Sequence, residues 1–170
     1  MTDVLVIMGS DSDLPILSNG LEILKEFFIE TEARFSSAHR SPERTVMIVK
    51  AFEKQGGKVI IAAAGMSAHL AGVIAGHTVL PVIGVPLSSP DFGALDSLLS
   101  MIEMPPGIPV GVMGKGKAGA KNAALLAIEI LAIGNPALRE KLLAYREKMK
   151  AEIEQKDADL QERGWEGYRK

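Results

Sequence analysis

Short apolar runs alternate along the chain with longer amphipathic stretches. The runs predict strands at Val4 to Met8, Thr31 to Phe35, Val59 to Ala64, Pro81 to Val85 and Pro109 to Met113. The stretches between and after them predict helices at Leu14 to Phe28, Pro42 to Gln55, Leu70 to His77, Ala94 to Met101 and Ala120 to Ile133. Because strands and helices alternate and the strands are apolar on both faces, we expect an α/β fold, a three-layer αβα, doubly wound, parallel sheet of five strands.

One further helix is predicted after this alternating pattern. Gly134-Asn135-Pro136 ends the fifth helix, and a charged amphipathic stretch continues to about Arg163. Apolar residues recur along it at helical spacing, namely Leu138, Leu142, Tyr145 and Met149. We therefore expect an extra C-terminal helix that packs on a neighbour, either in its own subunit or in another.

Composition and charge narrow the class of protein. A length of 170 residues suits one domain, and a net charge of −2 argues against a nucleic-acid partner. The chain has no cysteine, which excludes disulfides and thiol chemistry. The N-terminus lacks a basic segment and the apolar runs are too short to span a bilayer, so we expect a cytoplasmic protein without membrane contact. No Lys or Arg lies between Lys58 and Lys115, which indicates subunit contacts as well as a core.

Residues suited to chemistry concentrate in the loops that follow the strands. In a parallel sheet these loops lie at the carboxyl edge, where ligands bind. They contain glycines, serines and two of the three histidines, within residues 9–13, 37–41, 65–69, 86–93 and 114–119. With a flavodoxin-like strand order, the first and third loops flank the crevice and the second lies beside the first. We then expect convergence of Ser10, Asp13, His39, Arg40 and His69.

The second loop has the strongest chemical character. Ser36 to Ser41 carry the chain from a strand into a helix, with Ser41 as the expected N-cap and Pro42 at the first helical position. Free backbone N–H groups and the helix dipole there suit an anion, arginine binds phosphate bidentately, and histidine transfers protons near neutral pH. The alternative is an ordinary loop histidine beside a solvated arginine.

The other candidates also have structural alternatives. Ser10, Ser12 and Asp13 suit helix capping. If a phosphate binds nearby, aspartates would repel it, so Asp13 is better suited to accept hydrogen bonds from ribose hydroxyls. His69 could be a core histidine near a helix start, and His77 suits a structural role at a helix C-terminus.

Motifs of several other kinds of site are missing. Gly114-Lys115-Gly116-Lys117 lacks the full spacing of a nucleoside-triphosphate loop. No G-x-G-x-x-G follows the first strand, so a dinucleotide cofactor is not expected. The sequence has neither a G-x-S-x-G elbow nor a His, Asp and Glu set with the spacing of a metal site.

Seven short motifs stand in register over about residues 4–135. They are Met8-Gly9-Ser10-x-Ser12-Asp13, Ser37-Ala38-His39-Arg40-x-Pro42, Ala68-His69-Leu70, Leu80-Pro81-Val82-x-Gly84-Val85-Pro86, Asp96-Ser97-Leu98, Met104-Pro105-x-Gly107-x-Pro109-Val110 and Lys121-Asn122-Ala123-Ala124. Together they resemble the N5-carboxyaminoimidazole ribonucleotide mutase family of purine biosynthesis. The resemblance implies a flavodoxin-like, octameric enzyme that isomerises this ribonucleotide to the 4-carboxy compound without metal or organic cofactor.

The same resemblance implies residue roles. His39 matches the general acid/base, and His69 matches a second active-site histidine. The matching substrate-binding positions are Ser10, Asp13 and Arg40, and with them we assign the loop residues Gly9, Ser12, Ser37, Ala38, Gly65, Ser67 and Leu70. We interpret residues 1–135 as a flavodoxin-like catalytic domain and residues 136–170 as a helical extension of that domain.

The chain departs from the family pattern in the third loop. The family often has Gly-Gly-Ala-Ala before the position of His69, whereas Met66-Ser67-Ala68 stands here, and a usual proline is Ala71. A related class carboxylates aminoimidazole ribonucleotide directly with CO2, and it usually has lysine at position 40 and Ser-Asn in the third loop. Arg40 and His69 therefore favour the mutases.

The implied reaction makes physical demands that the sequence can meet. Decarboxylation of the substrate carbamate leaves CO2 beside the imidazole carbon that must recapture it, which requires confinement in a small, dry pocket. Small residues suited to line it are Ala64, Gly65, Ala68 and Ala71. One histidine with a pKa near neutral can move the proton in both steps.

Two other classes of protein stay open on sequence grounds. A flavodoxin-like module could bind a nucleotide or flavin without catalysis. A regulatory receiver domain would need a phosphoacceptor aspartate at the end of the third strand, but that strand ends in Ala64-Gly65.

Overall fold

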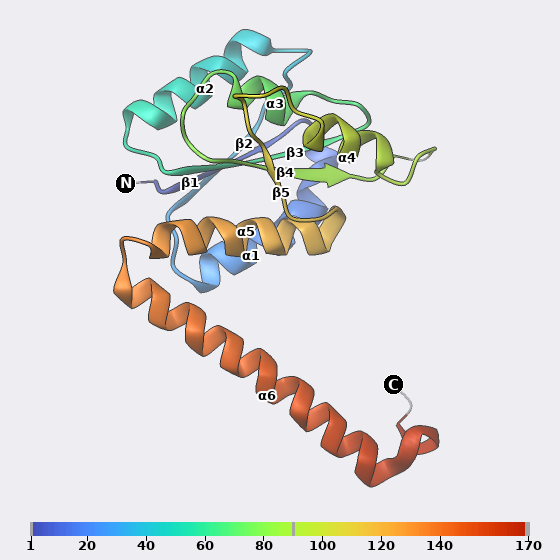
Figure 1. The fold of residues 1–170 in the computed structure, drawn as a ribbon. Coiled ribbons are helices and arrows are strands. Elements are labelled where there is room, and N and C mark those ends of the chain that lie inside the picture. Colours follow the sequence, from blue (N-terminus) through green and yellow to red (C-terminus); the bar gives the residue numbers. More distant parts are fainter. Residues whose placement is uncertain (1, 90, 169–170) are drawn as a thin grey trace. The chain divides into compact units, whose positions relative to one another are not determined.

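A five-stranded parallel sheet forms the centre of the chain in a computed structural model that describes residues 2–89 and 91–168 (Figure 1). Its strands are β1 (Val4–Met8), β2 (Thr31–Phe35), β3 (Val59–Gly65), β4 (Val82–Leu87) and β5 (Gly111–Val112). Their order in the sheet is β2-β1-β3-β4-β5, and all four pairings are parallel. The predicted doubly wound sheet is therefore confirmed, with its switch in strand order beside β1.

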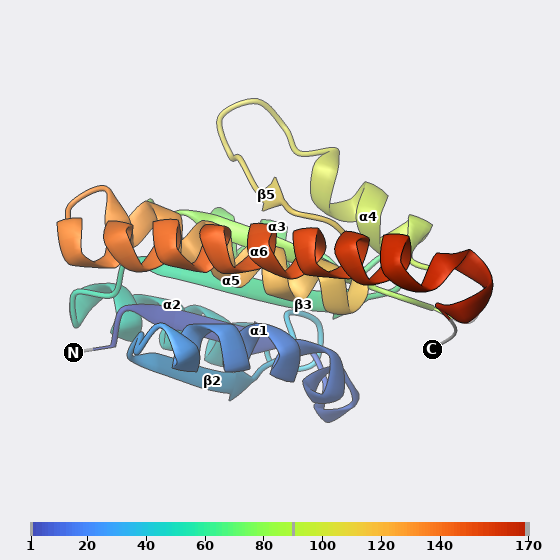
Figure 2. The same ribbon diagram turned by 90° about the horizontal axis from the view of Figure 1, so that it is seen from below.

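Helices cover both faces of this sheet. After a short 3₁₀-helix, η1 (Asp11–Asp13), come α1 (Leu14–Glu26), α2 (Pro42–Lys54), α3 (Leu70–Ala75), α4 (Leu95–Ile102), α5 (Gly116–Ala132) and α6 (Pro136–Gly167). Helices α1 and α5 lie on one face, and α2, α3 and α4 lie on the other (Figures 1 and 2). This arrangement confirms the three predicted layers.

Each face of the sheet has its own apolar core. Alternate strand residues such as Leu5 and Ile60 cluster with Val49 and Phe52 of α2. On the opposite face, α1 approaches α5 so closely at Gly20 that a Cβ there would lie 2.5 Å from the Ala120 carbonyl oxygen. Strands β1, β3 and β4 are thus buried on both sides, as their sequence predicts. The edge strand β2 is partly to fully exposed along its length, so the expectation of an apolar, buried strand is wrong there.

Several element boundaries differ from the sequence expectation by one or two residues, and larger differences occur in β5 and at the start of α5. Strand β5 pairs only through Gly111 and Val112, whereas Pro109 to Met113 had the pattern of a strand. Helix α5 begins at Gly116 rather than Ala120, so residues 116–119 of the expected glycine-rich loop are helical. The Gly119 N–H donates to the Lys115 carbonyl at 3.1 Å, and a Cβ on Gly119 would lie 2.1 Å from the Gly114 carbonyl oxygen. Glycine is therefore needed inside this first turn, although it normally disfavours helix.

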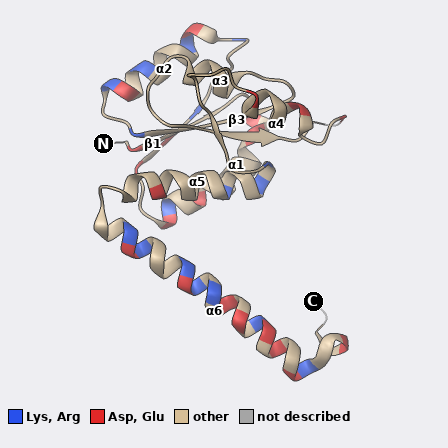
Figure 3. Cartoon of the chain, viewed as in Figure 1, with Lys and Arg blue, Asp and Glu red and all other residues tan. Residues whose placement is uncertain are grey.

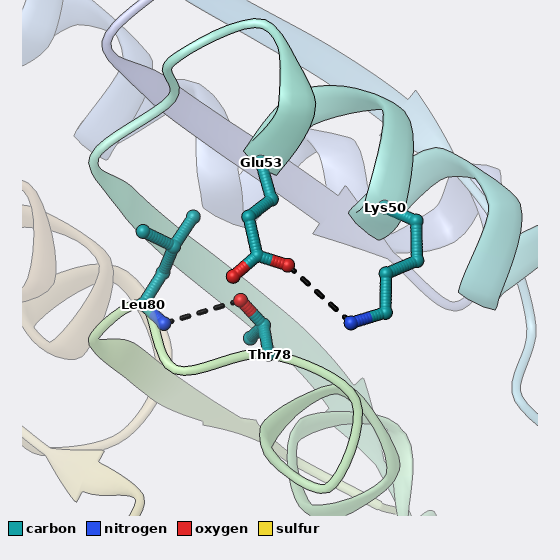
Figure 4. A network of polar contacts seen from close by, with 4 residues as sticks. All are labelled: Lys50, Glu53, Thr78 and Leu80. Atoms are coloured by element: carbon teal, nitrogen blue, oxygen red, sulfur yellow. Dashed lines mark hydrogen bonds and ion pairs between the residues drawn. The ribbon is translucent and has the colours of Figure 1, made fainter.

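A polar network ties α2 to the turn before β4, at the amino edge of the sheet (Figure 4). Lys50 Nζ lies 3.4 Å from the Glu53 carboxylate, and the Leu80 N–H donates to Thr78 Oγ1 at 3.1 Å. Partial burial raises the pKa of Glu53, but hydrogen bonds from Thr78 and Val79 and the Lys50 charge outweigh it, and the net pKa is lowered. The carboxylate therefore favours the folded state.

The chain divides into two compact units, residues 1–131 and 132–170. The second consists largely of α6, which Asn135 caps by accepting a 3.1 Å hydrogen bond from the Leu138 N–H. Lys, Arg, Asp and Glu follow one another along α6, whereas β3 and α3 are almost free of them (Figure 3). Leu138 and Leu142 are the buried residues of α6, while Met149 is 52% exposed. No described helix is both long and apolar enough to cross a bilayer.

Candidate active site

The loop after β1 is a tight turn held by its own carboxylates. The Ser10 N–H donates to Asp13 Oδ2 at 2.9 Å, and the Ser10 hydroxyl donates to Asp11 Oδ1 at 2.9 Å. Asp13 occupies the N-cap position of α1, but its side chain makes no capping bond to that helix. The carboxylate of Asp13 instead caps the preceding 3₁₀-helix η1, because it accepts from the N–H of Ser10, the N-cap residue of η1, as in a capping box.

The two aspartates of this loop differ in their electrostatics. Burial raises the pKa of Asp13, and hydrogen bonds from Ser10 and Ser12 only partly oppose that effect. The pKa of exposed Asp11 is lowered, first by the Ser10 hydroxyl and then by the Ser12 N–H. Sequence reasoning assigned no role to Asp11, although an aspartate directly after Ser10 and before a helix is a signal for such a turn.

The loop after β2 is anchored by hydrogen bonds where it leaves the strand and is exposed at its tip. Buried Ser36 and Thr45 share a 2.8 Å hydrogen bond between their hydroxyls, and the Arg40 N–H donates to the Ser37 hydroxyl at 3.1 Å. Ser41 precedes α2 as predicted, but its hydroxyl donates to the Ser37 carbonyl at 3.2 Å. These bonds fix the backbone that presents His39 and Arg40.

The loop after β3 carries the second histidine. His69 directly precedes α3, and its ring meets the His39 ring edge to face, with centroids 5.7 Å apart and planes at 89°. The Ser100 hydroxyl of α4 donates to the Ala68 carbonyl at 3.3 Å, which links this loop to α4. Both imidazoles are exposed, which excludes the alternative of His69 as a core histidine.

These three loops are joined at the carboxyl edge of neighbouring strands. Strand β1 lies between β2 and β3, so the loops that follow them are adjacent. Arg40 Nη2 donates to the Gly9 carbonyl at 2.8 Å, which links the second loop to the first. The His39–His69 contact links the second to the third. The predicted convergence of the loops is therefore observed.

Most of the remaining predicted site residues lie in these loops, but Leu70 does not. Ser12, Ser37, Ala38, Gly65 and Ser67 lie within the three loops. Leu70 is different, because its side chain is 2% exposed and belongs to the apolar core. The residue as a whole is buried, so Leu70 has almost no surface with which to contact a substrate. His77 follows α3 at the opposite edge of the sheet, away from the other two histidines.

The arrangement combines three kinds of chemistry on one exposed edge. Arg40 supplies a permanent positive charge for an anion, Asp13 supplies hydrogen-bond acceptors, and two imidazoles can exchange protons. Ala64 and Ala71, which were expected to line a pocket for CO2, are 2% and 0% exposed and belong to the apolar core instead. Within residues 2–89 and 91–168, no three His, Asp or Glu side chains are grouped closely enough to hold a metal ion.

Fold and site together define a flavodoxin-like protein with a candidate ligand site beside the switch in strand order, at the carboxyl ends of β1, β2 and β3. Residues 3–152 match a family model described as AIR carboxylase, and the chain belongs to this family.

Similar proteins match over nearly the whole chain. An N5-carboxyaminoimidazole ribonucleotide mutase of Pyrococcus horikoshii is 52% identical over 96% of this chain and 91% of that protein. A protein of the same description from Thermotoga maritima is 45% identical over 99% of this chain and 97% of that protein. The crystal structure of Treponema denticola PurE has a TM-score of 0.85 and 31% identity, covering 94% of this chain and 99% of that one.

Proposed function

We propose that this protein is an N5-carboxyaminoimidazole ribonucleotide mutase, an isomerase of purine biosynthesis that forms the 4-carboxy compound. Relatives of that description, which match over nearly their whole length, support the reaction. The observation that carries the assignment to this site is the His39–His69 contact, because it brings two proton-carrying groups to the loops that hold Arg40 and Asp13.

The charges of the site suit the parts of such a substrate. Arg40 binds the phosphate, since a guanidinium forms paired hydrogen bonds with phosphate oxygens. Asp13 accepts hydrogen bonds from the ribose hydroxyls, for which its partly buried carboxylate is suited. The substrate-binding surface also includes Gly9, Ser10, Ser12, Ser37, Ala38, Gly65 and Ser67.

His39 acts as the general acid and base in this proposal. The N–C bond of the substrate carbamate breaks, and its electron pair stays on nitrogen. That nitrogen then takes a proton from the imidazolium side chain of His39. The carbon of the substrate's own imidazole ring then attacks CO2, and the new C–C bond forms. The hydrogen on that carbon leaves as a proton to His39. His69 lies against the His39 ring and positions it. No metal or organic cofactor takes part.

Further parts of the proposal concern the molecule as a whole. Residues 1–135 form the catalytic domain and residues 136–170 its helical extension. The functional form is a homo-oligomer, an octamer as the family resemblance implies, and it works in the cytoplasm. Support for the oligomer comes from apolar side chains exposed on α6, among them Met149 and Ile153, which are 52% and 62% exposed.

An isotope experiment tests the reaction. Substrate labelled with ¹³C in the carbamate is supplied with unlabelled bicarbonate, without ATP, and the product carboxyl is analysed. Retention of label is expected, because confinement in the site can lower the barrier by about 7–11 kcal/mol relative to capture of CO2 from solution.

Two other results would contradict the mutase assignment. Complete loss of label, together with fast conversion of aminoimidazole ribonucleotide and CO2, would place the protein among the direct carboxylases. Binding of the ribonucleotide with no conversion of either substrate would indicate a nucleotide-binding module.

A further inference from the structure

Met66 combines two unfavourable features in the third loop of the site. Its φ is +56°, a left-handed conformation that costs free energy for any residue except glycine. Its side chain is also 69% exposed, so burial in the single chain does little to repay that cost. Strained, exposed apolar residues at a site call for a functional explanation.

The position of Met66 relates it to the chemistry. It directly follows Gly65, the last residue of β3, and stands three residues before His69. The loop around it is fixed by the Ser100 bond to the Ala68 carbonyl and by the His39–His69 contact. Met66 therefore belongs to the same anchored loop as the second histidine.

Met66 also differs in kind from the rest of the site surface. Residues 9–13, 36–41 and 65–69 contain Gly, Ser, Ala, Asp, His and Arg, and Met66 is their one large apolar residue. The intermediate of the proposed reaction is CO2, which is small, uncharged and lost if water enters. A flexible, unbranched and polarizable side chain can close over such a molecule and still let a ribonucleotide enter.

Building on the mutase function proposed above, we propose that the side chain of Met66 covers the site and retains CO2 between decarboxylation and recarboxylation. While the N–C bond is broken and the new C–C bond is not yet formed, Met66 excludes water and blocks escape.

The test compares two substitutions at this position. Met66→Gly removes the cover and suits φ +56°, so we expect a folded protein with an unchanged or higher melting temperature. Met66→Leu keeps an apolar cover. With ¹³C-carbamate substrate and unlabelled bicarbonate, Met66→Gly should lose several-fold more label than wild type and release aminoimidazole ribonucleotide. Added carbonic anhydrase should increase that loss in Met66→Gly, and Met66→Leu should behave as wild type.

Phe28→Gly is the matched control. Phe28 also has a left-handed φ, +61°, and is 81% exposed, but it precedes β2 at the opposite edge of the sheet. It should therefore retain label as wild type does. Equal retention by Met66→Gly and wild type would overturn the role of Met66 and leave the mutase function intact. A lower molar mass of Met66→Gly in light scattering would also overturn the role of Met66, because the residue would then serve contacts between copies of the chain. Absence of isomerisation by wild type would instead contradict the proposed function itself.

Discussion

His39 is exposed at the tip of an anchored loop, so its imidazole can be changed without disturbing the core. His39→Asn keeps a polar side chain of similar reach but cannot carry a proton. We expect turnover to fall by ~10²–10⁴, the usual contribution of general acid–base catalysis. Steady-state kinetics measure the fall, and circular dichroism checks that the variant is folded. Turnover near that of wild type would refute the role of His39.

Arg40 has two partners to satisfy, the Gly9 carbonyl and the proposed phosphate. Arg40→Ala should weaken ribonucleotide binding by roughly 1.5–3 kcal/mol, because a charge-assisted contact is lost. Binding of the phosphate-free nucleoside should change little, and calorimetry on both ligands separates the two effects. Arg40→Lys serves as the control that keeps the charge. Equal losses for nucleotide and nucleoside would show that Arg40 acts by holding the first loop.

The residue types of the site were predictable, but their arrangement was only partly so. Serine, histidine and arginine after apolar strands indicated the carboxyl edge, and the strand order then brought His39 and His69 together. The support from Asp11 and the left-handed φ of Met66 were not expected. Both depend on local backbone geometry, which hydrophobic periodicity does not encode.

At the scale of the elements, the first two strands were predicted more accurately than β5 and α5. The bounds of β1 and β2 are those expected from the sequence. The expected β5 was too long and the expected α5 too short, because Pro109 cannot donate to a sheet and Gly119 suggested a loop. The close approach of Gly119 to Gly114 decides the start of α5, and only the structure reveals it.

The connection between α2 and the turn before β4 depends on pH through Glu53. Its pKa is lowered in the folded protein, so its contribution to stability is present above the ordinary value of 4.5 and is lost as pH falls through the folded pKa. Thr78→Val removes one hydrogen bond to the carboxylate. We expect the pKa of Glu53 to rise in an NMR titration, and acid unfolding to begin at higher pH.

Thr78→Ser is the control for this prediction, since it keeps the hydroxyl that bonds Glu53 and accepts from the Leu80 N–H. An unchanged Glu53 titration in Thr78→Val would show that the Lys50 charge and the Val79 N–H account for the whole shift.

For the whole molecule, the uneven distribution of charge indicates assembly. No Lys or Arg lies between Lys58 and Lys115, whereas α6 is densely charged yet exposes several large apolar side chains. Met149 and Ile153 stand four residues apart on α6, on one side of the helix, and are 52% and 62% exposed. In a chain that stayed monomeric, such side chains would gain nothing from being apolar.

The last prediction is that these side chains bury against other copies. Wild type should give a molar mass several times the 18.2 kDa of one chain in light scattering. Met149→Lys combined with Ile153→Lys should lower that mass, because charged groups cannot be buried without partners. Glu154→Lys changes the net charge of α6 by the same amount without removing an apolar side chain, and it should leave the assembly intact. A double variant with the mass of wild type would show that α6 contributes no contact through this side. A monomeric wild type at micromolar concentration would contradict the oligomer altogether.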